Sequence, residues 1–291
     1  DRETGEIEGM DGFYYTSARR DYKAFDIWGS MWTVRKDHPN LPMLGIQIAN
    51  EYYRQVGYRY SIGVGVNTET ALPLERDHYQ LVTGRLNHFY MLNREMPQEA
   101  FQIAAVNMWR EAQLPPADTL RLEPVESMRE IESCFSFETQ ITTVPFKDAW
   151  YVDRRFFHHP VYHYDVFLLK EGDQARAILV MRRVTVGEHY VWRIVDYLGD
   201  IHALQGVSRA LAGLMTPDCE YIDFYTYGYD ESAICAAGFV KRDDTDTNVI
   251  PNYFEPFVQR NVDCWFNSDA PDNFVICKAD ADQDRPNQRR E

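Results

Sequence analysis

Residues 42–53, with the sequence PMLGIQIANEYY, could form an anion-binding turn between a strand and a helix. The preceding stretch DIWGSMWTV places Trp28, Met31 and Trp32 in a β-rich run, and apolar residues after Gly45 recur at helical spacing. A helix that begins after such a strand presents unpaired backbone N–H groups and the positive end of its dipole, where a phosphate can bind. Many ordinary helices also begin near a glycine, so the alternative is a helix that only packs on a sheet.

Two further residues could move protons. His88, in RLNHFYML, is expected on a strand, and histidine is the side chain best suited to accept a proton at neutral pH. Asp196, in IVDYLGD, is expected at the end of a strand, where its carboxylate could hold or deprotonate an amine. The alternatives are a hydrogen-bonded structural histidine and an aspartate that caps a strand end or loop.

The elements that must position these residues fall into two halves with the same order. When the two halves are aligned with an offset of 160 residues, Trp32 aligns with Trp192 and Ile62 aligns with Ile222. Each half runs strand, helix, strand and short helix, which implies a right-handed parallel crossover. Residues 94–120 between them carry a helical pattern that ends at a Pro-Pro pair. We therefore expect a first domain over 1–93, a connecting helix and linker over 94–120, a second domain over 121–280, and a polar tail over 281–291.

Composition limits the class of protein. With 291 residues, of which 45% are hydrophobic, the chain can form two globular cores. Its formal charge of −15 disfavours nucleic-acid polymers and anionic membranes as partners, and no apolar run reaches the roughly 20 residues that span a bilayer. The five cysteines lack zinc-ligand spacing, which favours reduced thiols and no metal over a disulfide framework or a nucleophilic cysteine. The sequence predicts a soluble cytoplasmic protein without membrane insertion.

The order of these elements resembles the core of the GNAT superfamily of acyl-CoA-dependent N-acyltransferases. The first half matches through MWTV, LPMLGIQIANEYY, IGVGVN and ALPLERDHYQ, and the second through VWRIVDYLGD, EYIDFYTYG and SAICAAGF. The strings GRLNHFYMLN, WYVDRRFFHHPVY and IPNYFEPFVQRNVD look more specifically like tandem-GNAT proteins of bacterial surface-polysaccharide gene clusters, which include N-acyltransferases of dTDP-linked amino sugars. The resemblance implies an α+β fold of two tandem GNAT-like domains with mixed, mostly antiparallel sheets, the first degenerate or N-terminally truncated.

The resemblance also implies acyl-CoA as cosubstrate, bound by the first domain. The residues implied as acyl-CoA-binding are Trp32, Val34, Leu44, Gly45, Ile46, Gln47 and Asn67, and His88 should face the cleft as the base, with Asp196 as the second catalytic candidate. The superfamily's pyrophosphate loop is only half present, because Pro42 and Gln47 replace two of its residues. Leu74 and Ile234 stand where the superfamily often has a tyrosine, so the proton for the leaving thiolate must come from another group or from water.

The acceptor implied by the resemblance is a nucleotide-linked amino sugar. Such a ligand needs an aromatic platform, cations for its diphosphate and short polar groups for its hydroxyls. The residues predicted to bind it are Trp150, Arg154, His159, Asn252, Tyr253, Glu255 and Arg285. The alternatives are that aromatic residues here belong to the core and that Arg285 pairs with the neighbouring Asp282 and Asp284.

Two other functions remain open at this stage. An aminoacyl-tRNA-dependent transferase of peptidoglycan-bridge type would share the fold, although net acidity disfavours a tRNA partner. A non-catalytic, ligand-binding pseudo-acyltransferase would explain the incomplete loop and the missing tyrosine. The acyl group, the sugar and the oligomeric state stay open, and a homodimer is compatible with the sequence.

Overall fold

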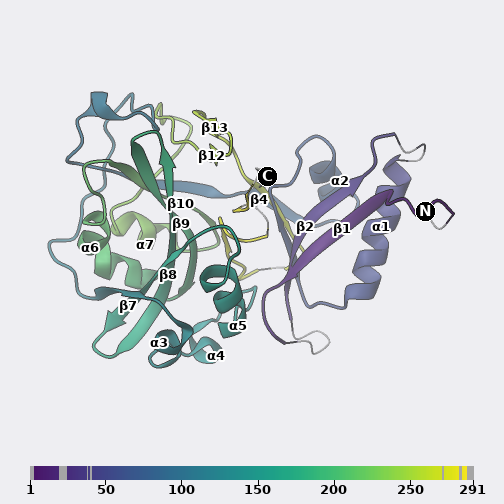
Figure 1. The fold of residues 1–291 in the computed structure, drawn as a ribbon, viewed down its shortest axis with the longest axis horizontal. Coiled ribbons are helices and arrows are strands. Elements are labelled where there is room, and N and C mark those ends of the chain that lie inside the picture. Colours follow the sequence, from purple (N-terminus) through teal and green to yellow (C-terminus); the bar gives the residue numbers. More distant parts are fainter. Residues whose placement is uncertain are drawn as a thin grey trace.

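The computed structural model describes residues 3–19, 25–37, 39, 41–270, 272–281 and 284–286, and they form two units that lie side by side (Figure 1). Each unit is built on one mixed sheet, so the α+β class with mostly antiparallel strands is confirmed. In Figure 1 the smaller unit carries β1, β2, α1 and α2, and the larger unit carries β7 to β10 with the remaining labelled helices. No helix in the described ranges is long and apolar enough to cross a membrane.

The first sheet has the strand order β1-β2-β3-β14-β4. Its strands are β1 (Gly9–Tyr15), β2 (Ile27–Val34), β3 (Ser61–Val64), β14 (Trp265–Ser268) and β4 (Val82–Arg85). Neighbours pair antiparallel except β2 and β3, which are parallel. The crossover between these two strands is α1 (Leu41–Val56), which packs on β1 and β2.

The second sheet has the strand order β11-β5-β10-β9-β8-β7-β6, and β15 also pairs with β10. Its strands are β11 (Val240–Lys241), β5 (Asn87–Leu92), β10 (Cys219–Tyr227), β9 (His189–Gly199), β8 (Gln174–Val186), β7 (Asp165–Glu171), β6 (Arg121–Val125) and β15 (Ile276–Cys277). Here β9 and β10 form the parallel pair. Both strands are buried along almost their whole length, charged residues included, which is typical of central strands covered on both faces.

The remaining elements are short. Helices surround the sheets as α2 (Ala71–Asp77), α3 (Met128–Glu132), α4 (Phe137–Gln140), α5 (Ala149–Val152), α6 (Ser208–Ala212) and α7 (Glu231–Ala236). Short helices of other types cover Gln98–Ala100, Asp153–Phe157 and Ile201–Val207, and a separate hairpin joins β12 (Tyr253–Phe254) to β13 (Phe257–Val258).

Each sheet contains one strand from the other half of the sequence. β5 lies in the range predicted for the first domain but pairs with β10 of the second sheet. β14 lies in the range predicted for the second domain but pairs with β3 and β4 of the first. The structural units are therefore not the contiguous segments 1–93 and 121–280. A single apolar cluster, with Trp28 and Ile62 from one unit and Val180 and Tyr225 from the other, joins the two sheets.

The helix expected over residues 94–120 is wrong. Apart from the turn Gln98–Ala100, this segment has no helix in the structure. The buried carboxylate of Glu220 accepts hydrogen bonds from the backbone N–H groups of Gln102, Ile103 and Ala104 at 2.7–3.0 Å. Because this side chain satisfies the N–H groups that a helix would use, tertiary contacts override the helical pattern.

The repeat offset of 160 residues needs a correction in the first strand of each half. The parallel registers pair Trp28 with Ile62 and Trp192 with Ile222. If Ile62 corresponds to Ile222, then Trp192 corresponds to Trp28 and not to Trp32. In the corrected register, Gly29 corresponds to Arg193, and its partner Gly63 corresponds to Asp223.

Candidate functional site

The parallel strands of the first sheet separate and leave a cavity. Their pairing runs from Ile27 and Ser61 to Gly29 and Gly63, and beyond this point each strand continues without the other. A cavity of about 250 Å³ opens there, and we call it the first-sheet cavity. Its walls are residues 29–32 of β2, residues 63–67 from β3 onward, and side chains from α1 and α2. Both residues at the point of separation are glycines and add no side chain to the gap, and the Asn267 side chain accepts a 2.9 Å hydrogen bond from the backbone N–H of Gly63.

The equivalent gap of the second sheet is filled by the protein itself. β15 pairs with Thr226 and Tyr227 of β10, and the backbone N–H of Ala279 donates to the carbonyl of Val195 in β9 at 2.7 Å. The chain segment around β15 therefore lies between β9 and β10. The residues that correspond to the two glycines are Arg193 and Asp223, which form a buried ion pair at 2.9 Å, and β9 and β10 stay paired one residue further, to Ile194 and Phe224.

A buried lysine holds the segment around β15 in place. The Lys147 ammonium lies 2.7 Å from a carboxylate oxygen of Asp196 and 2.7 Å from one of Asp280. Although burial acts to lower the pKa of Lys147, the two carboxylates raise it well above its usual value. Asp196, Cys277 and Asp280 have the spacing of metal ligands, but the ammonium supplies the cation that balances the two carboxylates.

Asp196 is therefore not at a strand end, as the sequence suggested. It lies within β9, is fully buried, and binds Lys147. A carboxylate that already holds a buried ammonium is not accessible to an amine substrate, so the proposed catalytic role does not fit its position.

Two carboxylates line the first-sheet cavity. Asp11, on β1, has its pKa raised to about 6 by burial and by the nearby charge of Glu75. Glu75, on α2, is buried, and burial raises its pKa. Its Oε2 atom has no hydrogen-bond partner among the described residues. Because both charges lie in one poorly solvated space, the pair is suited to hold a proton on one member and release it from the other.

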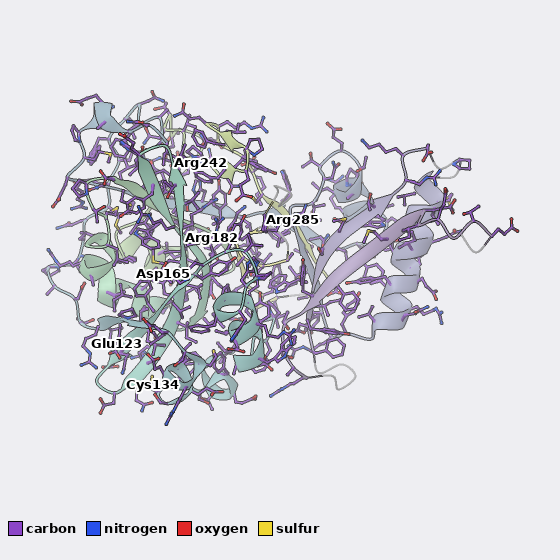
Figure 2. The ribbon with its side chains drawn as sticks, viewed as in Figure 1. Glu123, Cys134, Asp165, Arg182, Arg242 and Arg285 are labelled. Carbon is purple, nitrogen blue, oxygen red and sulfur yellow. The ribbon has the colours of Figure 1, made fainter. Side chains whose placement is uncertain are left out.

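A larger cavity lies between the two units. It has a volume of about 540 Å³ and is lined on one side by aromatic residues of β1 and by Trp28, and on the other by the region of α5. We call it the interdomain cavity. Four of the residues predicted to bind the acceptor line it: Trp150, Arg154, His159 and Arg285. The Arg154 guanidinium lies over the Trp150 ring, 5.2 Å from its centroid. In Figure 2, Arg285 lies between the two units.

The other predicted acceptor residues surround a small neighbouring cavity of about 90 Å³, which we call the Lys278 pocket. Asn252, Tyr253 and Glu255 line it, and Arg285 lines this pocket, the interdomain cavity and the first-sheet cavity. The structure thus brings all seven residues around two adjoining cavities. Asp282 lies outside the described residues. Asp284 is not part of a polar tail, because it is buried and binds Arg182 at 3.0 Å.

Only some of the predicted acyl-CoA-binding residues line the first-sheet cavity in the structure. Trp32 and Asn67 line the first-sheet cavity, whereas Val34, Leu44, Gly45, Ile46 and Gln47 do not. Asn67 Oδ1 accepts hydrogen bonds from the backbone N–H groups of Glu69 and Thr70 and so fixes the turn before α2.

Gly45 is not in a loop before the helix, because α1 already begins at Leu41. An amide at the fifth position of a helix donates to the carbonyl four residues earlier, so Gly45 is not an open phosphate donor. Its carbonyl accepts a 3.1 Å hydrogen bond from the Trp32 indole. A Cβ at this position would lie 3.7 Å from the side chains of Trp32 and Val34, which is ordinary contact, so Gly45 faces β2 and not an open phosphate site.

His88 also differs from the expected position. It lies on β5 within the second sheet, stacks on Tyr225 with ring centroids 3.8 Å apart, and does not line the first-sheet or interdomain cavity. Its Nε2 lies 3.2 Å from Asp223. Burial lowers the pKa of His88 more than Asp223 raises it, so the ring is neutral and donates from Nε2 to the carboxylate.

We expect His88→Asn to reduce stability without reducing catalysis. Loss of the buried hydrogen bond to Asp223 should lower the free energy of unfolding by about 1–3 kcal/mol, while turnover per folded molecule stays unchanged. Urea unfolding and an activity assay on the folded fraction measure the two effects. His163→Asn, at a side chain that is 89% exposed, is the control and should change neither. A drop of 100-fold or more in turnover for His88→Asn would restore the histidine as a base.

Comparison with solved structures identifies the fold. A GCN5-related N-acetyltransferase from Anabaena variabilis matches with a TM-score of 0.50 and 10% identity, over 90% of this chain and 58% of that one. A probable N-acyltransferase from Enterococcus faecalis matches with a TM-score of 0.49 and 9% identity, over 81% of this chain and 57% of that one. The N-myristoyltransferase of Saccharomyces cerevisiae with bound myristoyl-CoA matches with a TM-score of 0.45 and 8% identity, over 94% of this chain and 65% of that one.

The chain thus spans less than two thirds of each of these three proteins. No protein-family model and no curated protein sequence matches it. The first match shows the fold: the chain has the fold of the GCN5-related N-acetyltransferases, as the sequence resemblance implied. At 10% identity the likeness concerns the fold alone.

Proposed function

We propose that this chain is an N-acyltransferase that binds acyl-CoA in the first-sheet cavity. The observation that carries the proposal is the contrast between the two parallel strand pairs. β2 and β3 separate at two glycines and leave a cavity, whereas β9 and β10 carry the Arg193–Asp223 ion pair at the corresponding position and are closed beyond it by the segment around β15. A thioester arm that lies between separating strands can receive backbone hydrogen bonds on its carbonyl oxygen, which stabilises charge that develops during acyl transfer.

The carboxylates of the first-sheet cavity provide the proton transfers. Asp11 as a carboxylate accepts a proton from the acceptor amine, whose nitrogen forms a bond to the acyl carbon. The carbon–sulfur bond then breaks, and the proton that Asp11 accepted passes to the departing thiolate, while the negative charge of Glu75 keeps the pKa of Asp11 raised. This assignment replaces His88 and Asp196, and Asp11 fills the proton-donor role that Leu74 of α2 cannot take.

The acceptor in this proposal is a nucleotide-linked amino sugar, as the sequence resemblance implies, and it binds in the interdomain cavity. Cavities of 300–1,000 Å³ suit ligands of this general size, and this one has about 540 Å³. Trp150 offers a stacking surface, and Arg154 and Arg285 offer cations for phosphate. Arg285 lines both this cavity and the first-sheet cavity, so the two proposed substrate sites are neighbours.

The proposal is tested by release of the CoA thiol. Acetyl-CoA should raise the melting temperature of the chain, and a thiol-reactive dye should record CoA release that depends on a dTDP-amino sugar. Stabilisation by acetyl-CoA without release in the presence of any amino sugar would indicate a non-catalytic binding protein. No stabilisation by any acyl-CoA would contradict the proposal. Deacylation of aminoacyl-tRNA that depends on an amine acceptor would favour the transferase of peptidoglycan-bridge type.

A further inference from the structure

The Lys278 pocket contains a buried ammonium that no carboxylate neutralises at contact distance. Lys278 is 5% exposed and lines the pocket. Its Nζ lies 3.9 Å from Cys264 Sγ and 5.7 Å from the centroid of the Tyr225 ring. No carboxylate among the described residues lies within 4.0 Å of it, as ion pairing would require. Burial of a charge without such a partner is costly, and burial lowers the pKa of Lys278.

The other buried cations of this pocket are matched. Arg193 binds the carboxylate of Asp223 at 2.9 and 3.1 Å and also donates to Asn252. Arg182 binds Asp284 through Nε at 3.0 Å. Their charges are thus offset within the protein, whereas that of Lys278 is not.

The pocket as a whole is cationic in a strongly acidic protein. Its lining includes Arg182, Arg193, Lys278 and Arg285 but only two carboxylates, Glu255 and Asp284. With about 90 Å³, it is too small for a nucleotide and suits a single group of a few atoms. It adjoins the interdomain cavity, since Asp284 and Arg285 line both.

We propose that the Lys278 pocket binds an oxyanion, a phosphate or carboxylate group of the acceptor that occupies the interdomain cavity. The anion supplies the counter-charge that Lys278 lacks and anchors the acceptor at a point away from the thioester. The identity of the acceptor rests on the proposed function, whereas binding of the anion does not require acyl-CoA. The anion favours the charged form of Lys278.

The test is titration calorimetry with sulfate and, in parallel, with acetate. Sulfate stands in for a phosphate group and does not titrate near neutral pH. The variant is Lys278→Met, which removes the charge and keeps a chain of similar shape. We expect at least a tenfold loss of sulfate affinity. Lys170→Met, at a lysine of β7 that binds Glu123, is the matched control and should bind sulfate as the wild type does.

Thermal unfolding separates anion binding from a structural role. Because Lys278→Met removes a buried charge, its melting temperature without anions should equal or exceed that of the wild type. A lower melting temperature would mean that the ammonium is a structural partner of nearby carboxylates, and would overturn the proposal. Equal sulfate affinity in the wild type and Lys278→Met, or no binding of either sulfate or acetate, would also overturn it. Binding of acetate alone supports a carboxylate as the anion. None of these outcomes depends on acyl-CoA, so they are independent of the test of the proposed function.

Discussion

Gly29→Leu is expected to abolish acyl-CoA binding while the fold is kept. A Cβ at Gly29 would meet its nearest atoms, in Ile62, Gly63 and Ser61, at 3.8–4.0 Å, which is ordinary contact, and the backbone of Gly29 has no left-handed conformation. The rest of a leucine side chain would occupy the point where β2 and β3 separate. Since the thioester arm needs that space, the affinity for acetyl-CoA in calorimetry should fall by about 100-fold or more.

Gly12→Leu is the matched control. Gly12 lies on the neighbouring strand β1, its Cβ would meet atoms of Ser30 and Met31 at 3.8–3.9 Å, and it does not line the first-sheet cavity. This variant should bind acetyl-CoA as the wild type does. If Gly29→Leu is folded by circular dichroism and retains its affinity, acyl-CoA does not enter between β2 and β3.

Asp11→Asn is expected to lower kcat by roughly 10²–10⁴-fold, the usual effect of removing a general base. The amide has nearly the same shape as the carboxylate but cannot accept the amine proton. Steady-state CoA release measures kcat, and differential scanning calorimetry should show that the variant is folded. Asp165→Asn is the control, because Asp165 lies half-buried on β7 of the other sheet and burial raises its pKa as well.

The pH dependence of kcat/KM is a second, independent test of Asp11 as the base. The pKa of Asp11 is raised to about 6 by burial and by Glu75, and the base must be deprotonated to act. The wild-type kcat/KM should therefore be constant above about pH 7 and fall as the pH drops through 6. Asp11→Asn should lack this acidic limb. An unchanged limb in the variant would assign it to another group that faces the cavity.

The order of elements could be predicted from the sequence because apolar periodicity fixes it locally. The strands around Trp32 and Trp192, the helix after Leu41 and the short helices of both halves are present in the structure. The exchange of β5 and β14 between the sheets could not be predicted, since pairing of strands far apart in sequence leaves no local pattern.

The candidate site was only partly predictable. The acceptor-side residues were found because Trp150, Arg154 and His159 are close in sequence, and they line one cavity. Asp11 and Glu75 come from different elements, and nothing in their local sequence marks them. Gly29 and Gly63 had a usable signal, since a glycine inside a strand often marks a close approach or an opening.

His88 and Asp196 were misplaced for a common physical reason. Both are titratable residues on apolar strands, and the sequence does not show whether such a residue faces a cavity or a buried partner. The structure gives each a buried partner, Asp223 for His88 and Lys147 for Asp196.

The most direct test of the account is a crystal structure of this chain with bound CoA. We expect the pantetheine arm between β2 and β3, with its sulfur beside Asp11 and Glu75, and the segment around β15 unchanged between β9 and β10. An arm that displaces β15 and lies between β9 and β10 would contradict the account, as would CoA bound only at the surface with the first-sheet cavity empty.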